Sequence, residues 1–138
     1  MKIDRAAVYK KYDGHCAYCG CKLTMKQMQV DHIIPQYLIG AYLVNGDKYL
    51  ELRPTPIEQK AAMSIFEYTD GDHMDNLLPS CRQCNFYKQT FSIDDFRHNL
   101  EDTIWHKLEK DFNYRLLKKY GCIEEHREPI VFYFERKM

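Results

Sequence analysis

The chain lacks a long hydrophobic run. No stretch of its 138 residues is apolar over enough length to cross a bilayer, and the amino terminus lacks the basic and then apolar pattern of a secretory signal. From these absences we expect a soluble protein of the cytoplasm that has no membrane partner. Because the cytoplasm is reducing, cysteines there are better suited to metal binding than to disulfides.

The chain also lacks an excess of charge of either sign. Twenty basic residues balance 20 acidic residues, which argues against a general electrostatic attraction to nucleic acid. The distribution is uneven, since residues 1–30 carry six basic and two acidic side chains, whereas residues 45–76 carry three basic and seven acidic ones. The basic part could form a face for DNA, and the acidic part could repel non-specific DNA or contact a basic partner protein.

Internal repeats, low-complexity tracts and a glycine-rich phosphate loop are absent as well. A chain of this length and a mass of 16.6 kDa is typical of one domain with a modest core. We therefore treat residues 1–138 as a single domain.

Cysteine, by contrast, occurs six times, and four of the cysteines form two Cys-x-x-Cys pairs. The pairs are Cys16 with Cys19 and Cys81 with Cys84. Each pair can direct two thiolates at one ion from a tight turn or a helix start, and two pairs complete a tetrahedral structural zinc site. Disulfides are the alternative. Cys21 could replace Cys16 or Cys19 as a ligand, and Cys122 is expected to be a small buried residue.

Two polar residues interrupt an apolar segment between the cysteine pairs. Asp31 and His32 are flanked by the β-branched residues Val30, Ile33 and Ile34, which predicts a short strand. A carboxylate and an imidazole in such a strand suggest a functional role. A buried histidine with satisfied hydrogen bonds is the simpler interpretation of His32 taken alone.

The order of these motifs resembles the HNH endonuclease family of ββα-metal, or His-Me finger, nucleases. The resemblance covers Cys-Ala-Tyr-Cys-Gly, Val-Asp-His-Ile-Ile-Pro and Asp-Asn-Leu-Leu-Pro-Ser-Cys-Arg-Gln-Cys-Asn-Phe-Tyr-Lys, within a motif core of about residues 12–90. Asn85 stands where the family name has histidine, as in the HNN subset. Residues 91–138 are similar to the tails of small bacterial and phage members.

The resemblance implies a fold and an activity. We expect an α+β fold with a ββα-metal core, a structural zinc ion, flanking helices and a C-terminal strand. The implied activity is hydrolysis of DNA phosphodiester bonds by a one-metal mechanism that leaves a 5′-phosphate and a 3′-hydroxyl. The implied setting is a bacterial or phage-infected cell.

The residue types agree with that chemistry. Asp31 and Asn85 offer hard oxygen ligands for a catalytic Mg²⁺ or Mn²⁺ ion, and neutral His32 is suited to deprotonate the attacking water. Asn76 resembles the family residue whose side chain hydrogen-bonds across the ββ loop and orients the histidine. Lys88 lies one helical turn beyond Asn85 and could reach a phosphate of the nucleic acid, or could be a solvated surface lysine.

Capping residues and periodicity predict further elements. Asp4 is expected to cap a helix over about residues 5–12, and Asn45-Gly46 predicts a hairpin or an exposed turn over 42–50. Thr55-Pro56 predicts the start of a helix that extends to about residue 66. Ser92 caps a short helix. Ile104, Leu108, Phe112 and Leu116 predict the buried stripe of a longer helix that ends near Gly121, and residues 130–135 predict a strand.

We expect about residues 36–72 to form an ordered insertion, which is a natural place for substrate choice or, over 36–75, for a protein partner. Two alternatives to an active nuclease remain open. One is a zinc-knuckle module that binds nucleic acid without cleaving it, and the other is a nuclease subunit that is active only with a partner.

Overall fold

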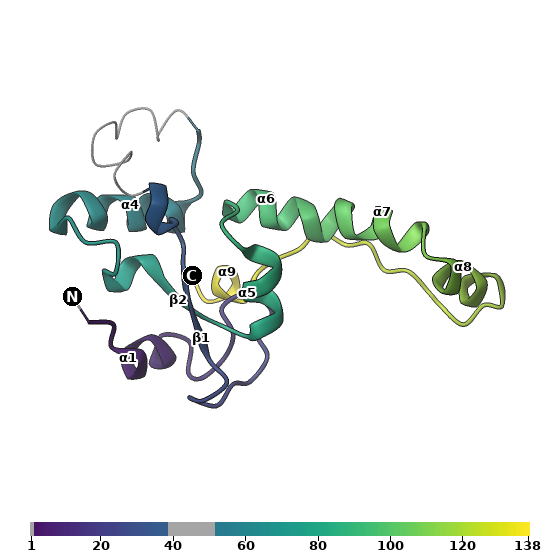
Figure 1. Cartoon of the computed structure of the whole chain (residues 1–138), viewed down its shortest axis with the longest axis horizontal. Helices are drawn as coiled ribbons and strands as arrows, with labels where there is room; N and C mark the ends of the chain where they lie inside the picture. Colours follow the sequence, from purple (N-terminus) through teal and green to yellow (C-terminus); the bar gives the residue numbers. More distant parts are fainter. Residues whose placement is uncertain (1, 39–51) are drawn as a thin grey trace.

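The computed structural model describes residues 2–38 and 52–138, and combines helices with one small antiparallel sheet (Figure 1). The coarse prediction of an α+β fold is confirmed. The predicted hairpin at residues 42–50 and much of the predicted insertion lie outside the described residues. The elements are α1 (Arg5–Lys10), β1 (Gln29–His32), α4 (Pro56–Tyr68), η1 (Met74–Asn76), β2 (Leu77–Ser80), α5 (Arg82–Lys88), α6 (Ile93–His98), η2 (Asn99–Thr103), α7 (Ile104–Glu109), α8 (Phe112–Lys119) and α9 (Tyr133–Arg136).

Strands β1 and β2 pair in antiparallel register, from Gln29 opposite Ser80 to His32 opposite Leu77. All four residues of β2 are buried, which explains why this short segment is apolar apart from its last residue. Helix α5 follows β2 directly and packs against β1. Two antiparallel strands and the next helix thus form one unit, and this unit carries the predicted site residues.

Local capping signals correctly predicted three helices. The Asp4 carboxylate accepts a hydrogen bond from Ala7 N at 3.1 Å at the start of α1. At α4, the Thr55 N–H donates to Glu58 Oε1 at 2.9 Å, and the Ser92 hydroxyl accepts from Asp95 N at 3.1 Å at α6. These side chains satisfy backbone groups that a helix end leaves unpaired.

The predicted long helix with a buried stripe is wrong. Elements α6, η2 and α7 follow one another in a nearly straight helical rod that projects from the body of the molecule (Figure 1), and the rod ends at Lys110. The Asp111 carboxylate then accepts from Tyr114 N at 2.9 Å and starts α8 as a separate helix. Phe112 is 84% exposed and Leu116 is 51% exposed, so they are not core residues.

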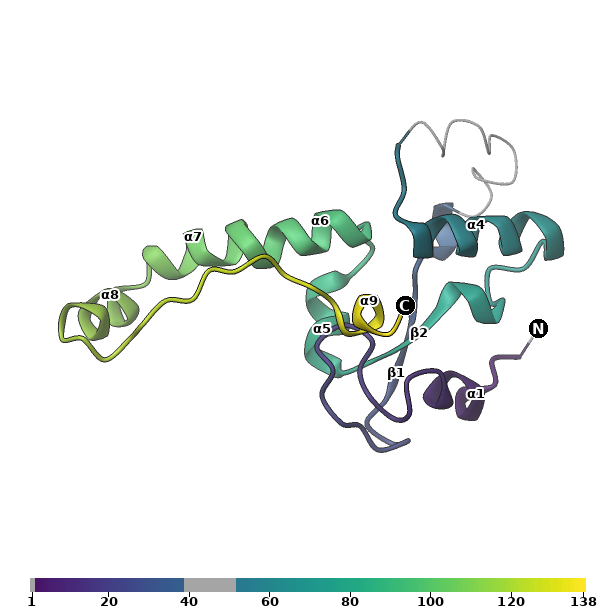
Figure 2. The same ribbon diagram turned by 180° about the vertical axis from the view of Figure 1, so that it is seen from behind.

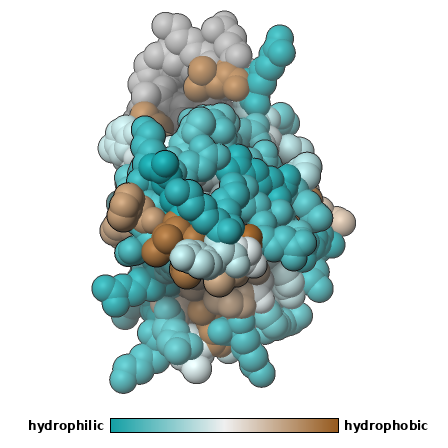
Figure 3. All heavy atoms as spheres, turned by 90° about the vertical axis from the view of Figure 1, so that its right-hand side faces the viewer, coloured by the Kyte–Doolittle hydropathy of each residue, from teal (hydrophilic) through white to brown (hydrophobic). Residues whose placement is uncertain are grey.

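The end of the molecule that carries α8 shows hydrophobic residues at its surface among hydrophilic ones (Figure 3). Within the described residues no other element covers the apolar side chains of α8. Periodicity alone therefore predicted an apolar face but not whether that face is covered.

The predicted C-terminal strand is also wrong. Residues 123–132 run back along α7 and α6, as both Figure 1 and Figure 2 show, and then form the short helix α9. Side chains, not a neighbouring strand, satisfy the backbone here: Glu101 Oε1 accepts from Ile130 N at 2.9 Å, and Arg97 Nη1 donates to Ile130 O at 2.6 Å. Arg97 also forms a bidentate pair with Glu135, at 2.7 and 2.9 Å.

The returning segment packs against the first cysteine turn. Tyr133 N donates to Tyr18 O at 2.9 Å, and Phe134 N donates to Ala17 O at 2.8 Å. The Tyr18 ring makes edge contacts with Phe96, Phe132 and Phe134, at centroid distances of 5.3 to 6.1 Å. This aromatic cluster joins the projecting rod, the C-terminal segment and the first cysteine turn in one core.

A helix with the length and apolarity of a membrane span is not found in the part of the chain that the structure describes.

Candidate metal centre and polar site

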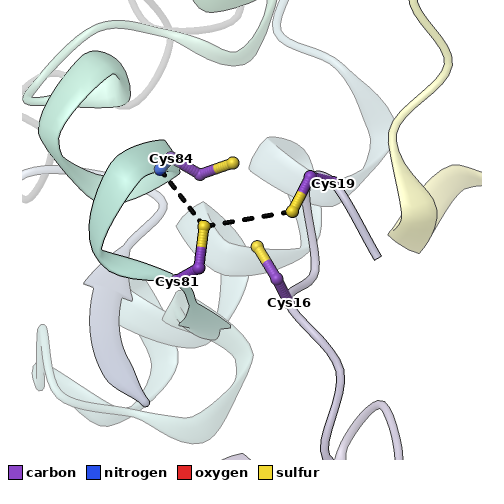
Figure 4. Close-up of side chains that lie close together, drawn as sticks. All are labelled: Cys16, Cys19, Cys81 and Cys84. Carbon is purple, nitrogen blue, oxygen red and sulfur yellow. Dashed lines mark hydrogen bonds between the residues drawn. The ribbon is translucent and has the colours of Figure 1, made fainter. Parts of the chain in front are cut away.

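Four cysteine side chains from two distant segments point toward one another (Figure 4). Their Sγ atoms all lie within 4.8 Å of one another, and the Sγ atoms of Cys19 and Cys81 are 3.9 Å apart. A tetrahedral zinc ion with Zn–S bonds of about 2.3 Å has sulfur atoms roughly 3.8 Å apart, so the cluster has the dimensions of such a site. The residues are Cys16, Cys19, Cys81 and Cys84, which could hold a metal ion such as zinc.

The two cysteines outside the cluster are exposed. Cys21 lies outside the cluster, so the four cysteines that the structure brings together are those of the two Cys-x-x-Cys pairs. The prediction that Cys122 is buried is wrong, because it follows α8 at the exposed end of the projecting rod.

Backbone geometry at each cysteine pair fits a metal knuckle. Gly20 has a φ of +80° and donates to Cys16 O at 3.0 Å, and a Cβ atom there would lie 2.8 Å from the Tyr133 ring. At the other pair, Cys81 Sγ accepts from Cys84 N at 3.3 Å at the start of α5. A hydrogen bond from Cys84 lowers the pKa of the Cys16 thiol against the opposing effect of burial, and the same bond raises the pKa of Cys84.

Asp31 is a buried carboxylate with two polar partners. It is 5% exposed, its Oδ2 accepts a hydrogen bond from the Tyr18 hydroxyl, and Lys88 Nζ lies 3.3 Å from the same oxygen. Burial raises the pKa of Asp31, and the charge of Lys88 and the Tyr18 hydrogen bond oppose that rise. Oδ1 has no hydrogen-bond partner among the described residues.

Lys88 is fully buried, contrary to both interpretations of the sequence. Its ammonium group donates to His32 O at 3.0 Å and lies 3.5 Å from Ile33 O, in addition to its contact with Asp31. A lysine that contacts a phosphate or is solvated must be exposed, and Lys88 is not. Lys88 instead fixes the end of β1, where the candidate polar residues lie.

Asn85 lies one turn before Lys88 on α5 and faces the same strand. Its Nδ2 donates to Gln29 Oε1 at 2.6 Å. Gln29 and Asp31 are two residues apart on β1, so their side chains share one face of the strand. Helix α5 thus places the Asn85 amide and the Lys88 ammonium group on the face of β1 that carries the Asp31 carboxylate.

His32 is held by a carboxylate that the sequence did not suggest. Its Nε2 lies 2.7 Å from Asp72 Oδ1, and Gln36 Nε2 donates to the same Asp72 oxygen at 3.0 Å. The hydrogen bond to His32 is the main reason that the pKa of Asp72 is lowered. The His32 side chain is 21% exposed, and Nδ1 has no partner within the described ranges.

Asn76 is fully buried and joins two loops. Its Oδ1 accepts from Ile34 N at 2.7 Å, and its Nδ2 donates to Ile34 O at 3.1 Å and to Gly71 O at 2.8 Å. These bonds tie the segment after His32 to the segment that carries Asp72. The hydrogen bonds across the loop agree with the prediction, and the consequence for Asp72 was missed because Asp70-Gly71-Asp72 resembles an ordinary acidic turn in sequence.

His73, next to Asp72, has a structural place. Its Nδ1 accepts from Asp75 N at 3.2 Å, and its ring stacks on Tyr68 at 4.6 Å. It caps η1.

Comparison of the chain with protein-family models, curated proteins and solved structures found no match.

Proposed function

We propose that the protein is a metal-dependent DNA endonuclease of the HNH type that hydrolyses phosphodiester bonds. The observation that supports this best is the hydrogen bond between His32 Nε2 and Asp72 Oδ1. This hydrogen bond leaves Nδ1 available as a base at the end of the strand that carries Asp31. A zinc-knuckle module that only binds nucleic acid has no use for an oriented imidazole beside a buried carboxylate.

His32 is the general base in this proposal. The Asp72 carboxylate accepts a hydrogen bond from the Nε2–H group and so fixes the tautomer in which Nδ1 carries the lone pair. Nδ1 takes a proton from the attacking water while the water oxygen bonds to phosphorus. The bond between phosphorus and the 3′ oxygen breaks, and the 3′ oxygen takes a proton from solvent.

Asp31 and Asn85 are the proposed ligands of a catalytic Mg²⁺ or Mn²⁺ ion, through Oδ1 of each side chain. The fit rests on donor chemistry, since a carboxylate and an amide oxygen suit a hard divalent cation, and the nitrogen of Asn85 is already engaged by Gln29. When bound, the ion would stabilise negative charge on the phosphate and the leaving oxygen. Lys88 holds Asp31 in place, and Asn76 holds the two loops that bring His32 and Asp72 together.

The cysteine cluster has a different role in the proposal. A zinc ion at Cys16, Cys19, Cys81 and Cys84 would join the turn after α1 to the start of α5, which fixes Asn85 relative to β1. Four thiolates close the coordination shell of zinc, so this ion would be structural.

Plasmid nicking tests the proposed function. Zinc-loaded wild type should convert supercoiled plasmid to nicked or linear forms with Mg²⁺ or Mn²⁺, and His32→Ala should be slower by at least about a hundredfold, because a general base contributes about 10²–10⁴-fold. The matched control is His98→Ala, since this side chain is 68% exposed on α6.

Equal cleavage by wild type and His32→Ala would show that another protein cleaves the DNA or that His32 is not the base. Absence of cleavage by wild type with either cation would favour the binding module or a subunit that needs a partner protein.

A further inference from the structure

A surface groove leads from the segment that follows the first cysteine turn to the proposed metal ligand Asn85. It consists of two adjoining hollows that share lining residues, among them Arg82 at the start of α5. One hollow extends to Lys22 and Lys26, in the segment before β1, and the other extends to Asn85 and Phe86 on α5. A ligand that lies along the groove would therefore reach the proposed metal ligand Asn85.

Outside the cysteine cluster, whose Cys81 also lines one hollow, the charged side chains of this groove are all basic. Lys22, Lys26 and Arg82 are exposed, and none of them forms an ion pair with any residue that the structure describes. No acidic residue is found among the described residues that line either hollow. In a chain with no net charge, three unpaired cations along one groove create a local attraction for an anion.

An aromatic ring lies at the end of the groove beside Asn85. Phe86 is 67% exposed, and only the edge contact with Tyr87, at a centroid distance of 5.3 Å, constrains its ring among the aromatic residues described. An exposed ring next to a cationic groove is the combination that binds single-stranded nucleic acid, because bases stack on the ring while phosphates follow the cations. A paired base inside a duplex cannot present its face in this way.

We propose that this groove binds an unpaired nucleic-acid strand, with phosphates at Lys22, Lys26 and Arg82 and a base stacked on Phe86. As a substrate site the inference rests on the proposed function, since the strand would deliver its phosphodiester to Asn85 and His32. Binding itself depends only on the groove, so it can be tested separately from cleavage.

Fluorescence anisotropy with a labelled single-stranded DNA oligonucleotide and zinc-loaded full-length protein tests the inference. Omission of Mg²⁺ and Mn²⁺ makes the result independent of cleavage. The double variant Lys22→Gln with Lys26→Gln should bind roughly tenfold more weakly, and its slope of log K against log salt should be smaller by about 1.4, at about 0.7 per lost phosphate contact. The control is Lys2→Gln with Lys60→Gln, which removes the same charge from exposed residues outside the groove.

Phe86→Ala should weaken single-strand binding about tenfold with an unchanged salt slope, because it removes stacking and no charge. It should leave binding to a duplex of the same sequence unaltered. The inference is overturned if the control pair weakens binding as much as the groove pair, or if Phe86→Ala binds single strands as wild type does. Groove-dependent binding by a protein that nicks no plasmid would support the proposed groove and contradict a nuclease that is active without a partner.

Discussion

Individual buried polar residues hold this structure in a defined arrangement. Asn76 satisfies three backbone groups, Lys88 satisfies two carbonyls and a carboxylate, and Asp72 holds His32. A buried polar group that loses its partner costs about 1–3 kcal/mol, so each of these contacts selects one loop conformation. Sequence suggested Asn76 because its motif has a fixed distance from Cys81. It did not suggest Asp72 or the burial of Lys88, because both depend on segments that meet only in the folded chain.

Lys11 gives a prediction at this scale. Its Nζ donates to Met74 O at 2.7 Å and to Leu77 O at 2.6 Å, and burial lowers its pKa from 10.5 to about 8 despite the attraction of Asp75. Between about pH 8 and 10.5 the unfolded chain therefore binds more protons at Lys11 than the folded chain does. In this range the stability of wild type should rise with pH relative to Lys11→Met, and below about pH 7 the difference should be constant.

Urea unfolding of both proteins from pH 6.5 to 10 measures this difference, with Lys2→Met as the exposed control. If the stability of wild type relative to Lys11→Met stays constant or falls as the pH rises above 8, burial does not disfavour the charged form of Lys11 in the folded protein.

Secondary-structure elements were predictable where their signals were local. Asp4, Thr55 and Ser92 start helices through hydrogen bonds within three or four residues, and such bonds can be inferred from sequence alone. Residues 130–135 have the composition of a strand, but Arg97, Glu101 and Glu135 supply the hydrogen bonds that a partner strand would have supplied. The prediction of a buried stripe on α7 and α8 was wrong for a related reason, since periodicity does not reveal whether another element covers an apolar helix face.

The cysteine cluster gives a prediction about the link between elements. Cys81→Ser should lose bound zinc and lower the melting temperature sharply, because a structural zinc site in a small domain contributes on the order of 10 kcal/mol. The matched control is Cys122→Ser, which removes an exposed thiol outside the cluster. Zinc content by mass spectrometry and thermal unfolding by circular dichroism would measure both effects. Retention of one zinc per chain by Cys81→Ser with an unchanged melting curve would reject the structural role.

In the whole molecule, the proposed site is assembled from segments that are far apart in the chain. β1 supplies Asp31 and His32, α5 supplies Asn85, and the loop before η1 supplies Asp72. The cysteine cluster and the C-terminal segment that packs against Tyr18 hold this assembly at one end of the projecting rod (Figure 1). The order of motifs in the sequence was enough to predict which of these segments meet, apart from the loop with Asp72.

The central claim is that oxygen ligands on β1 and α5 hold a divalent cation beside His32. Electron paramagnetic resonance titration of zinc-loaded protein with Mn²⁺, up to millimolar concentration, tests this most directly. We expect wild type and the control Gln83→Leu, an exposed change on the same helix, to bind one Mn²⁺ ion. We expect Asn85→Leu to bind it at least about tenfold more weakly, because one of its two protein ligands is lost. Wild type that binds no Mn²⁺, or Asn85→Leu that binds it as wild type does, would contradict the account.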